Sequence, residues 1–501
     1  MKRASGILLP IFSLPSEYGI GCFSKEAYQF VDMLKQAGQS YWQILPLGPT
    51  GYGDSPYQSF STYAGNPYFI DLETLVREGL LTESECREYD FGGQADSIDY
   101  ERIYKSRFTV LKKAYDRFRD RMAVGHQERE AYERFVNENA FWLDDYSLYM
   151  AVKDKNGGVS WNEWDTPLKN RDEKALAAAR DELAEEISFY KFQQYEFDCQ
   201  WKKLHAYANE QGVKIIGDIP IYVAFDSADT WAAPELFQFD ESNEPTRVAG
   251  CPPDGFSATG QLWGNPLYDW EYHRNTGYEW WIRRLGYCLN LYDVVRIDHF
   301  RGFDEYYSIP YGEKTAINGE WMPGPGMDLF RAIEEKLGRP AIIAEDLGFL
   351  TPSVLKLLED SGFPGMKVLQ FAFDARESSN YLPHTYPTHC VVYTGTHDND
   401  TTRGWYHAVG KEIRDFAKEY MCKPRLDEDT LAGDFIAMAM GSVADLCVIP
   451  MQDYLGLGSE ARINTPSTLG GNWMWRMKEG QFDDKTVEEV LRVTRLYGRL
   501  P

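Results

Sequence analysis

The stretch YDVVRIDHFRGFDEYY, residues 292–307, combines the pattern of a buried strand with several ionisable residues. Its two valines and its isoleucine form the continuous apolar pattern of a strand that is buried on both faces of a parallel sheet. Arg296, Asp298, His299 and Arg301 interrupt that pattern or follow it directly. Charge at the end of a buried strand needs a reason, because an unpaired charge inside a protein is costly.

The same kind of strand recurs along the chain. Short apolar, β-branched runs followed by turn residues occur at 6–14, 41–49, 213–223, 292–300, 340–348, 365–373, 389–398 and 445–458. Helix-like segments such as 24–38 and 328–338 lie between most of them. Eight strands that alternate with helices predict an α/β protein built on a (β/α)8 TIM barrel. A doubly wound open sheet is the alternative, but no glycine-rich phosphate loop follows the first strand.

The spacing of the strands predicts one large insertion. About 165 residues separate the second strand from the third, which is too long for a simple loop. We assign a mostly helical inserted region to 53–205, because segments such as 133–156 and 173–187 have a helical pattern. The whole chain, 1–501, is then a single catalytic barrel with insertions. Only a short stretch follows the eighth strand, so we expect no C-terminal β-sandwich.

The composition narrows the class of partner. The net charge is −25, which argues against nucleic acid or an anionic membrane as a main partner because their phosphates would repel it. The chain also contains 14 Trp and 33 Tyr. Most of these rings are expected to pack in the core and at its rim, but flat rings also stack on the apolar faces of sugars, which suggests a carbohydrate substrate.

The cysteines and the N-terminus suggest a reducing, cytoplasmic location. The eight cysteines are scattered without a CxxC pair, so buried free thiols are the favoured interpretation. Pro10 breaks the first apolar patch early and no small-residue cleavage site follows, so we expect no signal peptide. No apolar run approaches the length of a membrane span.

Ionisable residues gather where three of the predicted strands end. In a (β/α)8 barrel these carboxyl ends share one mouth, which is where active sites lie. A single acid there would be better explained as a structural ion pair or a helix cap. Like charges on three strand ends cost free energy, and this indicates chemistry. The residues are Arg296 and Asp298, Glu345 and Asp346, and His397 and Asp398.

These carboxylates fit the retaining mechanism of glycosyl transfer, which uses one carboxylate as nucleophile and one carboxylic acid as proton donor. Strand alternation places Arg296 on the same face as Asp298, where it should lower the pKa of that carboxylate. Glu345 follows the apolar run AIIA, which should raise its pKa. Asp398 would bind sugar hydroxyls, and His397 would either do the same or be an ordinary rim histidine.

Three of these strand ends resemble signatures of the α-amylase superfamily: DVVRIDHFRG, AEDLG and TGTHDND. The chain as a whole resembles 4-α-glucanotransferases of the amylomaltase type, also called disproportionating enzymes. The longer matching stretches lie at 41–72, 217–237, 252–270 and 456–476, and the match is weakest at about 80–200.

The resemblance implies that Asp298 is the nucleophile, Glu345 the general acid/base and Asp398 the residue that stabilises the transition state. It implies no cofactor and no metal, and it favours a cap or supporting role for Asp346. The substrate-binding residues that it implies are Tyr57, Asp254, Phe256, Trp263, Arg296, Asp374, His397, Asn464 and Pro466.

The loop at 250–266 offers a reason for transfer instead of hydrolysis. Its Pro and Gly residues predict a loop without regular structure. Phe256 and Trp263 would cover the mouth and exclude water, so that an acceptor sugar outcompetes water for the covalent intermediate.

The predicted function is transfer of an α-1,4-glucan segment to the 4-hydroxyl of glucose or a maltooligosaccharide. An α-glucan hydrolase with the same carboxylates is the nearest alternative. A non-catalytic glucan-binding protein would not need all three carboxylates. A metal-dependent barrel hydrolase would be expected to have paired histidines, such as HxH, at a strand end.

Overall fold

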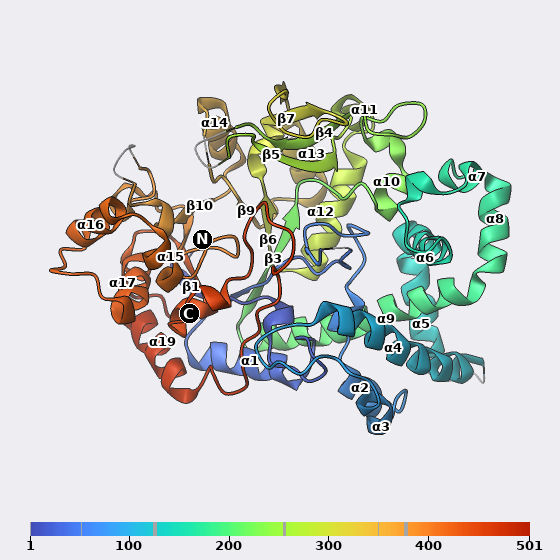
Figure 1. Ribbon diagram of the computed structural model, residues 1–501, viewed down its shortest axis with the longest axis horizontal. Helices are drawn as coiled ribbons and strands as arrows, with labels where there is room; N and C mark the ends of the chain where they lie inside the picture. The colour runs from blue at the N-terminus through green and yellow to red at the C-terminus, as the bar shows by residue number, and fades with distance from the viewer. Residues whose placement is uncertain (1, 52, 124–127, 254–256, 349, 375–378) are drawn as a thin grey trace.

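The computed structural model describes residues 2–51, 53–123, 128–253, 257–348, 350–374 and 379–501. Eight parallel strands form one sheet in the order β10-β11-β12-β1-β2-β3-β6-β9, and this confirms the predicted barrel (Figure 1). The strands are β1 Ala4–Leu8, β2 Tyr41–Gln43, β3 Lys214–Pro220, β6 Val294–Asp298, β9 Ile342–Ala344, β10 Gly365–Val368, β11 Cys390–Tyr393 and β12 Leu446–Pro450.

Alternation along these strands separates two apolar layers. Ile215 of β3 and Val295 of β6 belong to the core that also contains helix residues, so they face outward against the covering helices. Ile216 and Val294 belong to a separate cluster whose buried members all lie in the barrel strands, so they face inward. The inward phase of β6 continues through residues 296 and 298, which carries charged side chains into the barrel mouth.

The barrel ladder is interrupted between β9 and β10, and Asp346 bridges the gap. Its Oδ1 accepts a hydrogen bond from the Met366 backbone N–H at 2.6 Å, and the Ala344 N–H donates to the Pro364 carbonyl at 3.0 Å. Gly365 leaves room for this carboxylate, because an added Cβ there would lie 2.5 Å from Asp346 Oδ2. Asp346 therefore closes the barrel where strand pairing stops.

The chain between β2 and β3 is mainly helical and lies to one side of the barrel (Figure 1). The Trp201 indole N–H of the last helix donates to the Leu291 carbonyl at 3.1 Å, which ties this region to the helix before β6. The helices are α2 Leu72–Arg77, α3 Glu83–Arg87, α4 Tyr100–Ala123, α5 Arg129–Glu138, α6 Ala140–Lys155, α7 Thr166–Lys169, α8 Glu173–Glu182 and α9 Ala184–Glu210.

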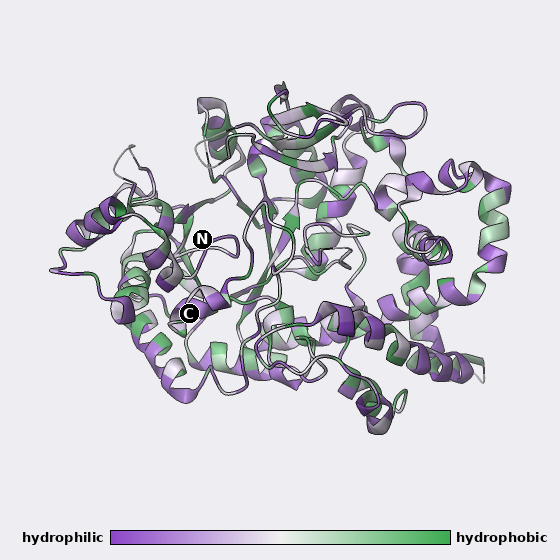
Figure 2. Ribbon diagram, viewed as in Figure 1, coloured by the Kyte–Doolittle hydropathy of each residue, from purple (hydrophilic) through white to green (hydrophobic). Residues whose placement is uncertain are grey.

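Other helices complete the outer layer, and Figure 2 shows hydrophilic residues concentrated on peripheral helices such as α4 and α16. None of the described helices is long and apolar enough to cross a membrane. The remaining helices are α1 Lys25–Gln36, α10 Ala228–Ala232, α11 Trp270–Asn275, α12 Glu279–Leu291, α13 Met327–Leu337, α14 Pro352–Ser361, α15 Thr402–Ala408, α16 Lys411–Tyr420, α17 Glu428–Gly441, α18 Met451–Tyr454 and α19 Asp484–Leu496.

A second, antiparallel sheet lies beside the barrel with the order β5-β4-β7-β8. Its strands are β4 Arg247–Cys251, β5 Gln261–Pro266, β7 Glu305–Pro310 and β8 Glu320–Pro323. The prediction that 250–266 lacks regular structure is therefore wrong at both flanks, which pair as Gly250 with Leu262 and Cys251 with Gln261. The sequence signal is weak because β5 is half-exposed and shifts register against β4.

The part of the chain after β12 that the structure describes contains only short helical elements and loops, with no β-sandwich. Arg499 is fully buried there, and its guanidinium donates to the carbonyls of Met440 and Ala4, each at 2.8 Å. The C-terminal segment is thus fastened to the first barrel strand.

Candidate active site

A buried ion network explains the charged end of β6. Strand register places Asp218 of β3 beside Arg296 and Pro220 beside Asp298. Arg296 Nη1 donates to both Asp218 oxygens, at 2.8 and 2.6 Å, and Nη2 donates to Asp298 Oδ1 at 2.9 Å. The side chains of Arg296 and Asp218 are 3% and 0% exposed, whereas that of Asp298 is 29% exposed. Only Asp298 therefore reaches the open mouth.

The two carboxylates hold the guanidinium in its charged form. Burial opposes the charge of Arg296, but Asp218 and Asp298 outweigh it and raise the pKa of Arg296 above its usual value. Burial raises the pKa of Asp218, with Arg296 opposing. Because buried charges are tolerated when they are paired and hydrogen-bonded, the network offsets much of its own desolvation.

Glu345 follows β9 in a different environment. The backbone N–H groups of His299 and Leu347 each donate to one of its oxygens at 2.7 Å. Burial and the nearby charge of Asp298 nevertheless raise the pKa of Glu345 to about 8, against the opposing effects of Arg296 and the two backbone donors. Glu345 therefore carries a proton at neutral pH.

Tyr57 connects the ion network to the other side of the mouth. Its hydroxyl donates to Asp218 Oδ2 at 2.9 Å, and burial raises the pKa of Tyr57, which keeps the hydroxyl protonated. Its ring stacks on His397 with centroids 5.1 Å apart and an angle of 18°. Trp473 supports both rings, at 5.9 Å from Tyr57 and 6.0 Å from His397.

Asp398 occupies the opposite edge and is more open, with a side chain that is 43% exposed. Its Oδ1 accepts a hydrogen bond from Asn464 Nδ2 at 2.7 Å and lies 3.4 Å from His397 Nε2. Arg462 donates to the Asp398 carbonyl at 2.8 Å. The segment that contains Asn464 therefore holds both the backbone and the carboxylate of Asp398.

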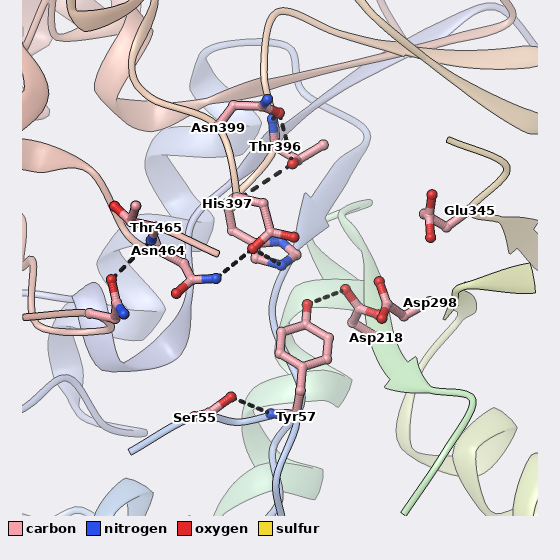
Figure 3. A network of polar contacts seen from close by, with 12 residues as sticks. Ser55, Tyr57, Asp218, Asp298, Glu345, Thr396, His397, Asn399, Asn464 and Thr465 are labelled. Atoms are coloured by element: carbon pink, nitrogen blue, oxygen red, sulfur yellow. Dashed lines mark hydrogen bonds and ion pairs between the residues drawn. The ribbon is translucent and has the colours of Figure 1, made fainter. Parts of the chain in front are cut away.

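In Figure 3, Asp298 and Glu345 lie on one side of Tyr57, and His397 and Asn464 lie on the other. An ion-paired carboxylate, a protonated carboxyl group and a third open carboxylate at one mouth can together cleave and re-form a glycosidic bond.

The structure brings some predicted site residues together and leaves others apart. The polar network contains Tyr57, Arg296, Asp298, Glu345, His397, Asp398 and Asn464. Trp263 lies next to this network, with its ring 4.8 Å from that of His299. Asp374 follows the short turn after β10 and Pro466 lies near Asn464, and both remain predicted substrate contacts. Asp254 and Phe256 lie outside the described residues.

Two residues of the site were missed by the sequence reasoning, Asp218 and Trp473. Asp218 stands in the apolar strand KIIGDIP, in phase with the inward-facing Ile216. A charge inside such a strand was the same signal that identified Arg296. Trp473 stands in a glycine-rich stretch, and its sequence context gives no comparable signal.

The chain matches known proteins over nearly its whole length. The profile of glycoside hydrolase family 77, described as 4-alpha-glucanotransferase, matches residues 9–482. The 4-alpha-glucanotransferase of Clostridium butyricum is 51% identical over 98% of this chain and 99% of that protein. The 4-alpha-glucanotransferase of Thermus thermophilus is 49% identical over 96% of each chain.

A solved structure agrees with these matches. The amylomaltase from Streptococcus agalactiae in complex with acarbose is 40% identical, with a TM-score of 0.96 and coverage of 100% of both chains. The expected resemblance is thereby confirmed, and the hydrolase alternative is not favoured. The chain belongs to the 4-alpha-glucanotransferase family.

Proposed function

We propose that Asp298, Glu345 and Asp398 carry the glucan transfer of this 4-alpha-glucanotransferase, through a covalent glycosyl-enzyme intermediate. The observation that carries this proposal is the contrast between Asp298, which is paired with Arg296, and Glu345, whose pKa of about 8 keeps it protonated. The retaining mechanism needs this division between a nucleophile and an acid.

In the first half-reaction an α-1,4-glucan occupies the mouth. Glu345 gives its proton to the glycosidic oxygen while an oxygen of Asp298 attacks C1 of the donor sugar. The C1–O bond breaks, an ester forms with Asp298, and the leaving glucan departs with a free 4-hydroxyl group. Positive charge builds up on the sugar ring in the transition state, and nearby carboxylates favour it.

In the second half-reaction the 4-hydroxyl of an acceptor attacks the same carbon. Glu345, now ionised, takes the hydroxyl proton, and the ester to Asp298 breaks. Two inversions at C1 give net retention, so the product is again an α-1,4-glucan. We assign glucose and maltooligosaccharides as acceptors, because each has a 4-hydroxyl group at its non-reducing end.

Asp398 and its neighbours would hold the sugar at the cleavage point. The open carboxylate of Asp398 can accept hydrogen bonds from sugar hydroxyls, and Asn464 fixes the direction of that carboxylate. The stacked pair of Tyr57 and His397 lies between this carboxylate and the ion network, and supplies a flat wall.

The remaining proposals concern the whole chain. We assign residues 1–501 to one catalytic barrel domain, with 53–205 as a region inserted between the second and third barrel strands. We also propose a cytoplasmic location, which is supported by the fact that all eight cysteines are free thiols.

The experiment is to incubate the protein with maltotriose and follow the ladder of oligosaccharides together with total reducing ends. Transfer yields longer and shorter products while the number of reducing ends stays constant. A rise in reducing ends that matches the loss of maltotriose would instead show hydrolysis. The same assay on Asp298→Asn tests the assigned nucleophile, because the amide cannot form the ester.

A further inference from the structure

His299 is one of the charged or polar residues of the 292–307 stretch that the mechanism above leaves without a role. It directly follows Asp298 and adopts a left-handed backbone conformation, with φ of 58°. This turn directs its backbone N–H toward Glu345 Oε2, at 2.7 Å. A side chain with a Cβ is strained in this conformation unless the surroundings fix it, so the position indicates a specific demand.

The imidazole ring of His299 makes a separate contact on the other side. It lies perpendicular to the Trp263 ring, with centroids 4.8 Å apart and an angle of 88°. Tyr222 is a further neighbour at 6.4 Å. Gly302 leaves room for the ring, because an added Cβ there would lie 3.3 Å from His299 Cδ2.

The imidazole is held in its neutral form. Its Nε2 is buried and has no hydrogen-bond partner among the described residues. Burial lowers the pKa of His299 to about 4, against the charge of Asp298. A neutral ring suits a packing contact with an aromatic face better than an ion pair would.

One residue therefore touches the β4–β5 hairpin through its side chain and the acid/base carboxyl through its backbone. We infer that His299 is a positioning residue that couples the seating of Trp263 over the mouth to the placement of Glu345. This inference rests on the proposed role of Glu345 as general acid/base. Through this coupling, His299 affects both proton transfer by Glu345 and the exclusion of water by Trp263.

The coupling predicts the direction in which the pKa of Glu345 changes when the His299 side chain is removed. Among the described residues, the charged groups that act on Glu345 are Asp298 and Arg296 from β6, and the Tyr381 hydroxyl, whose pKa Glu345 helps to raise, is a further titratable neighbour. Burial is the largest cause of the high pKa of Glu345. The His299 N–H bond opposes it, and removal of the imidazole would release the turn from Trp263 and weaken that bond, so the pKa of Glu345 should rise.

The test uses the substitution His299→Asn, because asparagine tolerates the left-handed conformation. We expect the alkaline limb of kcat/KM for maltotriose cleavage to move up by about half a pH unit or more, since that limb reports the acid in the free enzyme. We expect the ratio of hydrolysis to transfer to rise at the same time. A protein in which His299 merely fills space would lose stability and keep both values.

A matched control is His273→Asn. His273 is also a buried imidazole among aromatic rings, and burial likewise lowers its pKa to about 4, but it lies on α11 and bonds to the Leu236 carbonyl. This variant should lower the melting temperature and leave the alkaline limb and the hydrolysis ratio unchanged. Equal shifts in both variants would overturn the inference.

A double-mutant cycle with Trp263→Phe measures the coupling directly. If the two residues act together, the effect of the double variant on the hydrolysis ratio will be smaller than the product of the single effects by more than about twofold, the scatter of independent sites. Effects that multiply within twofold would refute the coupling. Should His299→Asn fail to fold, Trp263→Phe alone decides, because it must also move the alkaline limb.

The parent enzyme separates this inference from the proposed function. If the parent has no alkaline limb near pH 8, the role of Glu345 is wrong. If the limb is present and His299→Asn and Trp263→Phe leave it in place, only the inference about His299 fails.

Discussion

The ends of β6 and β9 lie at the same mouth, but they place their carboxyl groups in opposite environments. Asp298 receives a hydrogen bond from a guanidinium whose charge is held by a second, fully buried carboxylate. Among the described residues, only backbone N–H groups donate to Glu345 and no cation bonds to it, and burial raises its pKa to about 8. Two neighbouring strand ends thus offer an ion-paired carboxylate suited to be a nucleophile and a carboxyl group suited to be an acid, which is a general way to divide roles between carboxyl groups.

The largest expected effect comes from removal of the carboxylate on the β6 side. Asp298→Asn should reduce turnover of maltotriose by about 10⁴-fold or more, because no covalent intermediate can form. The control is Glu305→Gln, which removes a carboxylate from a more exposed position seven residues further along the chain. This variant should leave turnover close to that of the parent. Near-normal activity of Asp298→Asn would mean that the two strand ends do not differ in the way described.

The second test removes the acid on the β9 side. Glu345→Gln should slow cleavage of maltotriose by about 10³-fold, within the range for general acid catalysis. A glycosyl fluoride donor has a leaving group that needs no proton, so it should still load Asp298, and mass spectrometry should detect the adduct. Glu359→Gln on the exposed face of α14 is the control for loss of a carboxylate. Absence of any adduct would contradict the two-step chemistry.

The third test weakens the support of the β6 side without touching the nucleophile. Asp218→Asn removes the charge that pairs most closely with Arg296 and should lower the free energy of unfolding by about 3 kcal/mol, as expected when a buried pair is broken. Turnover should fall by roughly tenfold to a hundredfold, because Arg296 is then free to turn away from Asp298. Thermal denaturation and steady-state kinetics measure the two effects, and an unchanged melting temperature would argue against the network.

The smallest expected effect is the pH dependence of kcat/KM in the parent enzyme. Glu345 must be protonated to cleave the donor, so kcat/KM for maltotriose should be level around neutral pH and fall about tenfold for each unit above pH 8. With a glycosyl fluoride the same limb should disappear, since protonation of the leaving group is not required. A limb that persists with the fluoride would belong to a group other than Glu345.

The barrel was predictable because its strands are continuous apolar runs, and the gathering of carboxyl groups at its mouth was predictable because they stand directly after those runs. The role of Asp218 could not be predicted in this way. Its partner, Arg296, is 78 residues away in sequence, and only strand register places them side by side. Asp398 and Asn464 likewise meet only through the fold.

The hairpin at 250–266 was missed for another reason. Its strands lie outside the barrel, so they have no continuous apolar pattern, and glycine at 250 and 264 resembles a loop signal. The contact of Trp263 with His299 depends on that hairpin and could not be derived from local sequence. Sequence patterns report burial along one element, whereas these features depend on which elements become neighbours.

The bridge made by Asp346 has a consequence for heat tolerance. Glu345 immediately precedes the residue whose single carboxylate joins β9 to β10 across the gap in the ladder. Warming should loosen the barrel first where strand pairing is sparsest, and Glu345, the proposed proton donor, is attached at that place. Catalysis should therefore stop at a lower temperature than the one at which the helices melt, which makes loss of activity an early sign of a barrel that is opening.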